Sequence, residues 1–187
     1  MGWLALCAGL LMTGLAPLPA SAAEKSKGTK AGQQSKQIAG WVERVSMLPG
    51  NELALAKLDT GAKTSSIHAQ DIEFFEREGE DWVRYTLVLK ESRTVVHRVP
   101  RESRVVRTIY VKDHEQRPDP RPVVELEFCM DGRRHSALFS LVHRGAFLYS
   151  VLLGREFLAG SFVVDPDVTF VTGAPDVSEC GPEREAH

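Results

Sequence analysis

The chain has 187 residues, and its 25 acidic residues against 23 Lys and Arg give a formal net charge of −2. A chain this close to neutral lacks the overall basic charge of a typical nucleic-acid-binding protein, so we expect no nucleic-acid partner. Its length fits one compact domain.

The first 23 residues have the features of an export signal. Trp3 to Leu15 is an uncharged apolar run, and residues 20–22 are small, as at signal-peptide cleavage sites. The run is shorter than the roughly 20 residues that a membrane-spanning helix needs. We therefore predict a signal peptide at 1–23 and a periplasmic location. No basic residue precedes the apolar run, which leaves an uncleaved N-terminal anchor as the alternative.

The remainder divides by composition into a spacer, a domain and a tail. Residues 24–37 are polar and have no apolar pattern, so we predict a disordered linker. The folded domain is predicted at 38–173. Residues 174–187 contain Pro, Gly and Glu and are expected to form a flexible tail.

Apolar residues alternate with polar ones through most of the domain, which indicates strands rather than helices. In chain order, the predicted strands are 38–47, 52–59, 66–76, 82–90, 94–99, 105–112, 123–130, 133–142, 150–153, 162–164 and 168–171. One short helix is predicted at 155–158. Asp131-Gly132 predicts a hairpin turn, and 114–121, with two prolines, is expected to be an exposed loop. Many short strands with regular turns predict an all-β sandwich or barrel.

Two groups of side chains allow more than one interpretation. Arg98, Arg101, Arg104 and Arg107 alternate with Val and Pro. We interpret them as the solvent-facing side of strands, with contact to an acidic ligand as the alternative. Cys129 and Cys180 follow the leader and could form a disulfide in an oxidising compartment, and two separate thiols are the alternative.

Residues 54–62 place an Asp-Thr-Gly sequence directly after an apolar strand. The end of a strand is a rigid platform for the Asp59 carboxylate, and Thr60 can hydrogen-bond the backbone of a facing loop. Gly61 permits a close backbone approach and donates its amide near the carboxylate, while Ala62 keeps the surroundings small. An ordinary Asp-Gly-type turn is the alternative.

A second segment, 150–158, predicts a buried strand, a glycine and a short helix. Leu153, Gly154 and Arg155 follow the Asp-Thr-Gly-Ala sequence at a spacing that resembles the retropepsins. In those aspartic peptidases the late glycine lets a second strand pass closely under the catalytic loop. The resemblance implies Asp59, Thr60 and Gly61 as catalytic residues, with Ala62, Leu153, Gly154 and Arg155 supporting them.

Several separated motifs narrow the resemblance to one bacterial family. The segments 38–43, 57–69, 82–85, 152–156 and 165–166 are similar to the family labelled "putative ATP-dependent zinc protease", which is associated with RimK-type glutamate ligases. This resemblance covers about residues 38–172. It implies a closed retropepsin-like (acid protease) barrel, and a glutamate-ligase-linked or membrane-system partner.

The residues give no support to the zinc or ATP part of that label. The sequence contains no HExxH, no P-loop and no Cys/His pair at zinc-finger spacing. We therefore expect no metal and no cofactor, and a metal-dependent hydrolase is kept as an alternative. Retroviral enzymes carry an Asp where this chain has Lys63, so the partner of Arg155 is not identified from the sequence.

Aspartic peptidases need two carboxylates that share one proton. The chain has a single Asp-Thr-Gly, and residues 171–174 repeat its pattern without a carboxylate. The sequence therefore predicts an aspartic endopeptidase acting on a peptide or protein substrate, with Asp59 of two chains meeting on the twofold axis of a homodimer. Residues 77–81 and 92–104 are candidates for a flap over the substrate. A catalytically silent binding module on the same fold is the alternative.

Overall fold

The computed structural model describes residues 35–112, 118–175, 178 and 180. These residues belong to one compact unit, 32–187. The leader, most of the linker and most of the tail predicted above lie outside the described residues. None of the described helices has the length and apolar character needed to cross a bilayer.

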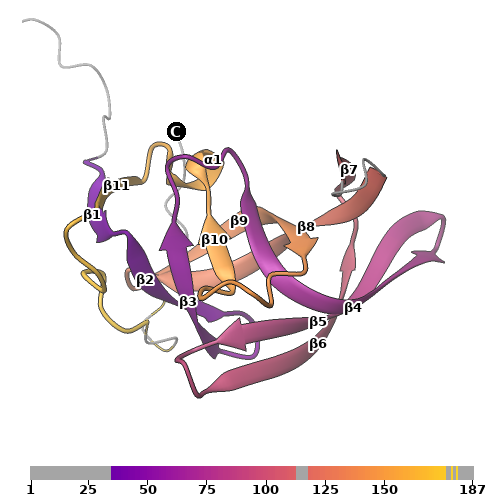
Figure 1. Ribbon diagram of the computed structural model, residues 1–187, viewed down its shortest axis with the longest axis horizontal. Helices are drawn as coiled ribbons and strands as arrows, with labels where there is room; N and C mark the ends of the chain where they lie inside the picture. The colour runs from indigo at the N-terminus through magenta and orange to yellow at the C-terminus, as the bar shows by residue number, and fades with distance from the viewer. Residues whose placement is uncertain (1–34, 113–117, 176–177, 179, 181–187) are drawn as a thin grey trace, which may run out of the picture. The chain divides into compact units, whose positions relative to one another are not determined.

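Strands dominate the described residues, and one short helix interrupts them (Figure 1). In chain order the elements are β1 (Gln37–Gly40), β2 (Val42–Met47), β3 (Glu52–Leu58), β4 (Ser65–Arg77), β5 (Glu80–Lys90), β6 (Val96–Arg104), β7 (Arg107–Lys112), β8 (Pro118–Met130), β9 (Arg133–Val142), β10 (Val151–Leu153), α1 (Arg155–Leu158) and β11 (Phe162–Asp165). The predicted all-β fold and the helix at 155–158 are confirmed.

Six of these strands close into a barrel in the order β10-β3-β2-β8-β9-β4, because β4 pairs back onto β10. Two of the contacts are parallel, β10 with β3 and β4 with β9. Alternate side chains point inward from each strand and fill the centre. Among the core residues, Val45, Ile67, Phe128, Phe139 and Leu153 have no solvent-exposed surface. The closed barrel that the resemblance implied is therefore confirmed.

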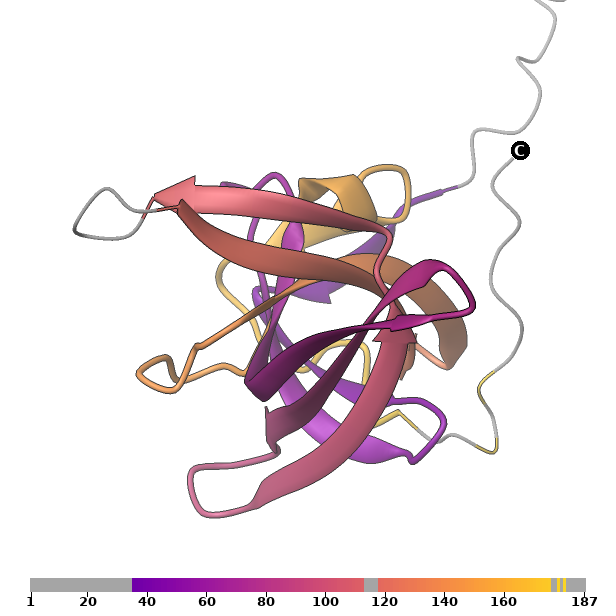
Figure 2. The same cartoon turned by 90° about the vertical axis from the view of Figure 1, so that its right-hand side faces the viewer.

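Three extensions leave the barrel. The far half of β4 forms a hairpin with β5, and β6 adds to the other edge of β5. β7 pairs with the first part of β8, and β1 pairs in parallel with β11 as a separate two-stranded sheet. Figure 2 shows the β7–β8 hairpin and the loop 143–150 projecting on the same side of the barrel.

The loop predicted at 114–121 is wrong in its described part, because β8 begins at Pro118 and not at Val123. Pro118, Pro120 and Pro122 fall at alternate positions of the strand. Their nitrogens, which have no hydrogen to donate, therefore face one edge, and the other edge is free to pair with β7. The number of prolines suggested a loop, whereas their spacing is compatible with a strand.

The strand predicted at 168–171 is also absent from the structure. Phe170 has a φ of 59°, which ends any extended run there. The segment is nevertheless held against β2, since Trp41 N donates to Val168 O and Phe170 N donates to Val42 O.

One other local prediction is confirmed, and the structure decides between two alternatives that the sequence left open for the cysteines. Asp131 and Gly132 form the turn between β8 and β9 with φ angles of 55° and 64°, as a two-residue hairpin requires. Cys129 and Cys180 are joined as a disulfide with a Cα–Cα distance of 6.0 Å. Three members of the basic cluster bond acidic or amide side chains, Arg98 with Gln70, Arg101 with Glu52 and Arg104 with Glu80.

One buried carboxylate ties the C-terminal end of the domain to its first strands. Glu43 is fully buried, and its Oε1 accepts hydrogen bonds from Gly40 N at 2.7 Å and Val171 N at 3.0 Å. Its Oε2 accepts from the backbone N and the hydroxyl of Thr172. A buried carboxylate is tolerated only when such donors replace water, so Glu43 holds Val171 and Thr172 in place.

We predict that Glu43→Gln lowers the free energy of unfolding by about 2–4 kcal/mol, because one acceptor oxygen becomes an NH₂ facing buried N–H groups. Urea denaturation measures the change. Glu76→Gln, at an exposed position of β4, serves as the control and should leave stability within about 0.5 kcal/mol. Equal effects of the two variants would contradict the role assigned to Glu43.

Candidate active site

The Asp59 carboxylate lies where β3 leaves the barrel. Leu58 pairs with Leu153 of β10, and the next backbone amide, Asp59 N, donates to Leu153 O at 2.9 Å. β10 is only three residues long, and all three are buried, with Leu152 8% exposed. The loop that carries Asp59 therefore starts directly at the wall of the closed barrel.

The two oxygens of Asp59 have different environments. Oδ1 accepts hydrogen bonds from Gly61 N at 2.9 Å and Ala62 N at 3.2 Å. Oδ2 is 3.0 Å from Nζ of Lys57. The bond from Lys57 is the main cause that lowers the pKa of Asp59; partial burial opposes it, and the amides of Gly61 and Ala62 reinforce it.

The short helix locks the loop that follows Asp59. Arg155 Nη1 donates to Thr60 O at 2.9 Å and to Gly61 O at 2.8 Å, and Arg155 N donates to Ala62 O. These carbonyls are the partners of Arg155 that the sequence left open. Through them, a guanidinium on α1 holds the loop without the acidic side chain that retroviral enzymes would place at Lys63.

Gly154 allows this close approach. A Cβ at this position would lie 2.5 Å from Thr64 O and 2.6 Å from Thr64 C, too near for any side chain. Gly154 N donates to the hydroxyl of Ser65 at 3.1 Å. The two sequence motifs, Asp-Thr-Gly-Ala and Leu-Leu-Gly-Arg, are thus packed together. Thr60 is exposed, and its hydroxyl forms no hydrogen bond with another described residue.

A cavity of about 390 Å³ opens beside the carboxylate. Its lining is aromatic and apolar with two cations, and consists of Trp41, Lys57, Asp59, Arg144, Phe147, Leu148, Tyr149 and Leu152. Trp41 and Tyr149 meet edge to face at 5.9 Å between ring centroids. Phe147 and Leu148 are more than half exposed, so the cavity carries apolar surface that is open to a ligand.

Arg144 brings a second positive charge to this cavity. Its Nη1 donates to the hydroxyl of Ser66 at 3.0 Å, and its guanidinium lies 4.4 Å from the centroid of the Phe147 ring. Burial lowers the pKa of Arg144, and the charge of Asp59 opposes that effect. No carboxylate of the described residues is within salt-bridge distance of Arg144.

The loop that carries Arg144 is anchored to the barrel. His68, which is 1% exposed, accepts a hydrogen bond at Nδ1 from Arg144 N at 3.0 Å. Lys90 Nζ donates to Gly145 O and Phe147 O, and Lys90 N donates to the hydroxyl of Ser150. Burial lowers the pKa of His68, in keeping with a neutral imidazole that accepts at Nδ1.

Sequence reasoning missed both cations of the cavity. Lys57 precedes Asp59 by two residues, so the period of a strand places both side chains on one face; that signal was available and was not used. Arg144 carried no comparable signal, because only the packing of the loop 143–150 brings it near Asp59.

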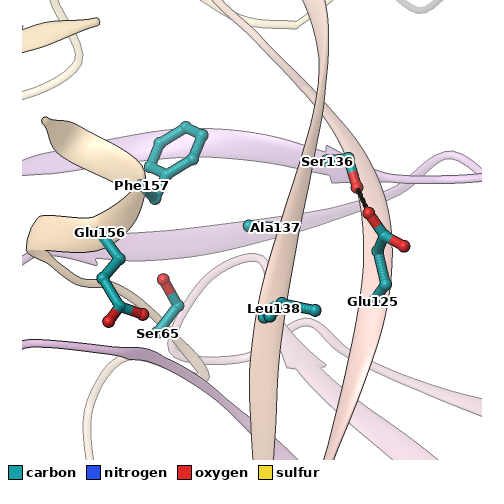
Figure 3. Close-up of a pocket in the computed structure, with 7 residues that line it drawn as sticks. All are labelled: Ser65, Glu125, Ser136, Ala137, Leu138, Glu156 and Phe157. Atoms are coloured by element: carbon teal, nitrogen blue, oxygen red, sulfur yellow. Dashed lines mark hydrogen bonds between the residues drawn. The ribbon is translucent and has the colours of Figure 1, made fainter. Parts of the chain in front are cut away.

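A second, smaller cavity of about 260 Å³ shares none of these residues. Ser65, Glu125, Ser136, Ala137, Leu138, Glu156 and Phe157 line it (Figure 3). The hydroxyl of Ser136 donates to Glu125, and the Ser65 hydroxyl already accepts from Gly154 N. Glu156 pairs with Lys63, so the polar side chains of this cavity are already engaged with other groups of the protein.

No three His, Cys, Asp or Glu side chains gather in the described part of the chain at distances suited to a metal ion. His68 and His143 meet edge to face at 5.1 Å between centroids. His97 contacts Glu91 at 2.7 Å. Each of these three histidines thus contacts another side chain of the protein.

The curated relatives of this chain are larger proteins. The chain is 36% identical over 119 residues to a "Probable alpha-L-glutamate ligase" from Shewanella pealeana, which covers 63% of this chain and 26% of the ligase. A protein of the same name from Desulfotalea psychrophila is 32% identical, over 63% of this chain and 25% of its own length. The chain thus spans about a quarter of these relatives.

A crystal structure and a family model match a larger share of this chain than the ligases do. The structure is that of Lpg0085, a Legionella pneumophila protein of unknown function, with 32% sequence identity and a TM-score of 0.62; the match covers 74% of this chain and 99% of that one. The family model described as "Retropepsin-like aspartic endopeptidase RimB" matches residues 38–175. The chain therefore belongs to the RimB-like family of retropepsin-like aspartic endopeptidases.

Proposed function

We propose that the protein is an aspartic endopeptidase whose catalytic dyad forms from Asp59 of two identical chains. The observation that carries this proposal is the asymmetry of the Asp59 carboxylate. One oxygen is held by the amides of Gly61 and Ala62, the other is bound by the Lys57 ammonium, and the residue lines a cavity large enough for a side chain. Backbone donors orient the carboxylate, as a catalytic acid or base requires.

The described residues of one chain place no second acid in the cavity beside Asp59. Asp59 is the one carboxylate among the described residues that line the cavity. A twofold axis near the loop 59–62 would bring a second Asp59 to the first. The exposed Thr60 supports this arrangement, because its hydroxyl is available to the facing loop of a partner chain.

The chemistry then follows from the charge of the pair. Two carboxylates at contact distance share one proton, because two like charges so close do not both ionise. The ionised Asp59 takes a proton from a bound water, and the water attacks the scissile carbonyl. The protonated Asp59 of the other chain donates a hydrogen bond to the developing oxyanion. The tetrahedral intermediate then collapses: the C–N bond breaks, and the proton taken from the water passes to the leaving amine, so no bond to the enzyme forms.

The charges of the cavity support acidic peptides as substrates. Lys57 and Arg144 line a space whose only described acidic side chain is Asp59. A carboxylate entering beside Asp59 would meet both cations, and charged hydrogen bonds of this kind are the strong ones. The names of the relatives, alpha-L-glutamate ligases, point to the same chemistry. We therefore propose glutamate-rich peptides as the substrate class.

Two further proposals concern the surroundings of the enzyme. The Cys129–Cys180 disulfide supports export to an oxidising compartment such as the periplasm.

Four residues of the loop 143–150 line the cavity, so this loop already covers part of the site. The flap candidates 77–81 and 92–104 contribute none of the lining residues.

We predict that Asp59→Asn reduces cleavage of a glutamate-rich peptide to background while the fold and the dimer remain. The amide cannot take a proton from water. Mass spectrometry of the products across acidic to neutral pH measures cleavage, and light scattering measures the dimer. A wild type that cleaves nothing, or an equally active variant, would contradict the enzyme and favour a binding module.

We predict that Arg144→Leu lowers kcat/KM for a glutamate-rich peptide by about 10–100-fold, the effect of losing one charged hydrogen bond. The value of kcat/KM for the same peptide with glutamine in place of glutamate should fall much less. Arg93→Leu, at an exposed position outside the cavity, is the matched control. If both peptides lose activity equally, Arg144 does not select acidic side chains.

A further inference from the structure

The Lys57 ammonium occupies the oxygen of Asp59 that the proposed chemistry needs. Oδ1 accepts two backbone amides, so Oδ2 is the oxygen left to activate water or to share a proton with a partner carboxylate. Lys57 Nζ lies 3.0 Å from this oxygen. In the single chain, the reactive oxygen is thus bound in an ion pair.

We propose that Lys57 is a positioning residue that keeps Asp59 ionised while the cavity is empty and releases it when an acidic substrate side chain binds the ammonium instead. This inference rests on the proposed peptidase function. It assigns Lys57 two linked tasks, recognition of the substrate carboxylate and control of the proton that the dyad shares.

The charges around Asp59 favour this coupling. From β3 Lys57 contacts Oδ2, from the loop 143–150 Arg144 adds a second positive charge, and from α1 Arg155 reaches the carbonyls of Thr60 and Gly61. Tyr149 is the remaining titratable group of the cavity. In a dimer each Asp59 would have its own ammonium, so both carboxylates could ionise and the shared proton would be lost at a lower pH.

The exposure of the pair makes exchange of partners feasible. The Lys57 side chain is 41% exposed and that of Asp59 is 24% exposed. An ion pair open to water to this degree is weak, and a lysine carries its charge on a long chain of rotatable bonds. A substrate carboxylate in the same cavity can therefore attract the ammonium away from Oδ2. With its positive charge neutralised, Lys57 no longer opposes protonation of the dyad.

The test compares pH profiles of kcat, which report the pKa values of the enzyme–substrate complex, for a glutamate-rich peptide and its glutamine counterpart. In the wild type, the loss of activity at rising pH should occur at higher pH with the glutamate peptide, because its carboxylate neutralises Lys57. Lys57→Met should move the glutamine profile to higher pH and bring the two profiles together. Lys63 lies in the loop after Asp59, and its exposed ammonium pairs with Glu156. Lys63→Met removes this ammonium and should change neither profile.

Coincident profiles in the wild type, or profiles that stay apart in the Lys57→Met variant, would overturn the inference.

A second measurement does not depend on peptidase activity. A ¹³C NMR titration of the Asp59 carboxyl should show a higher pKa in Lys57→Met than in the wild type and in Lys63→Met; an unchanged pKa would equally overturn the inference. If the wild type cleaves neither peptide, the proposed function fails, and the release step that depends on it fails with it. The titration then still decides whether Lys57 controls the charge of Asp59.

Discussion

The site depends on the contact between the loop that carries Asp59 and the segment formed by β10 and α1. Asp59 N bonds to Leu153 O, Arg155 binds the carbonyls of Thr60 and Gly61, and Gly154 leaves room for the backbone of Thr64. Because β10 is also the strand that closes the barrel between β3 and β4, the loop is held by the same strand that completes the core. A carboxylate placed in this way does not need its own side-chain packing to stay oriented.

Positive charge dominates the space in front of that carboxylate. Lys57 comes from the strand that leads into Asp59, and Arg144 comes from a loop that Lys90 and His68 anchor to the barrel. The two cations would attract an acidic peptide, and one of them also restrains the aspartate that would cleave it. In the proposed mechanism, recognition of the substrate and protonation of the dyad are coupled by electrostatics in one cavity, and the names of the chain's curated relatives, probable glutamate ligases, fit an acidic substrate.

The parts of this architecture that local pattern decides could be predicted from the sequence. Alternation predicted most strands, Asp131-Gly132 predicted its turn, and the paired motifs around Asp59 and Gly154 predicted two segments that do pack together. The errors arose where local and non-local information conflict. Prolines at alternate positions suggested a loop although they suit a strand edge, and apolar residues at 168–171 suggested a strand although Phe170 turns the chain. The position of Arg144 near Asp59 could not be predicted from the sequence, because only tertiary packing brings the two residues together.

The central claim is that catalysis needs one Asp59 from each of two chains. Mixing wild-type protein with Asp59→Asn protein, exchanging the subunits and measuring peptide cleavage tests it directly. Random pairing leaves both carboxylates only in wild-type homodimers, so activity should fall as the square of the wild-type fraction. Activity that falls in simple proportion to that fraction would show that one Asp59 is sufficient, and would contradict the account.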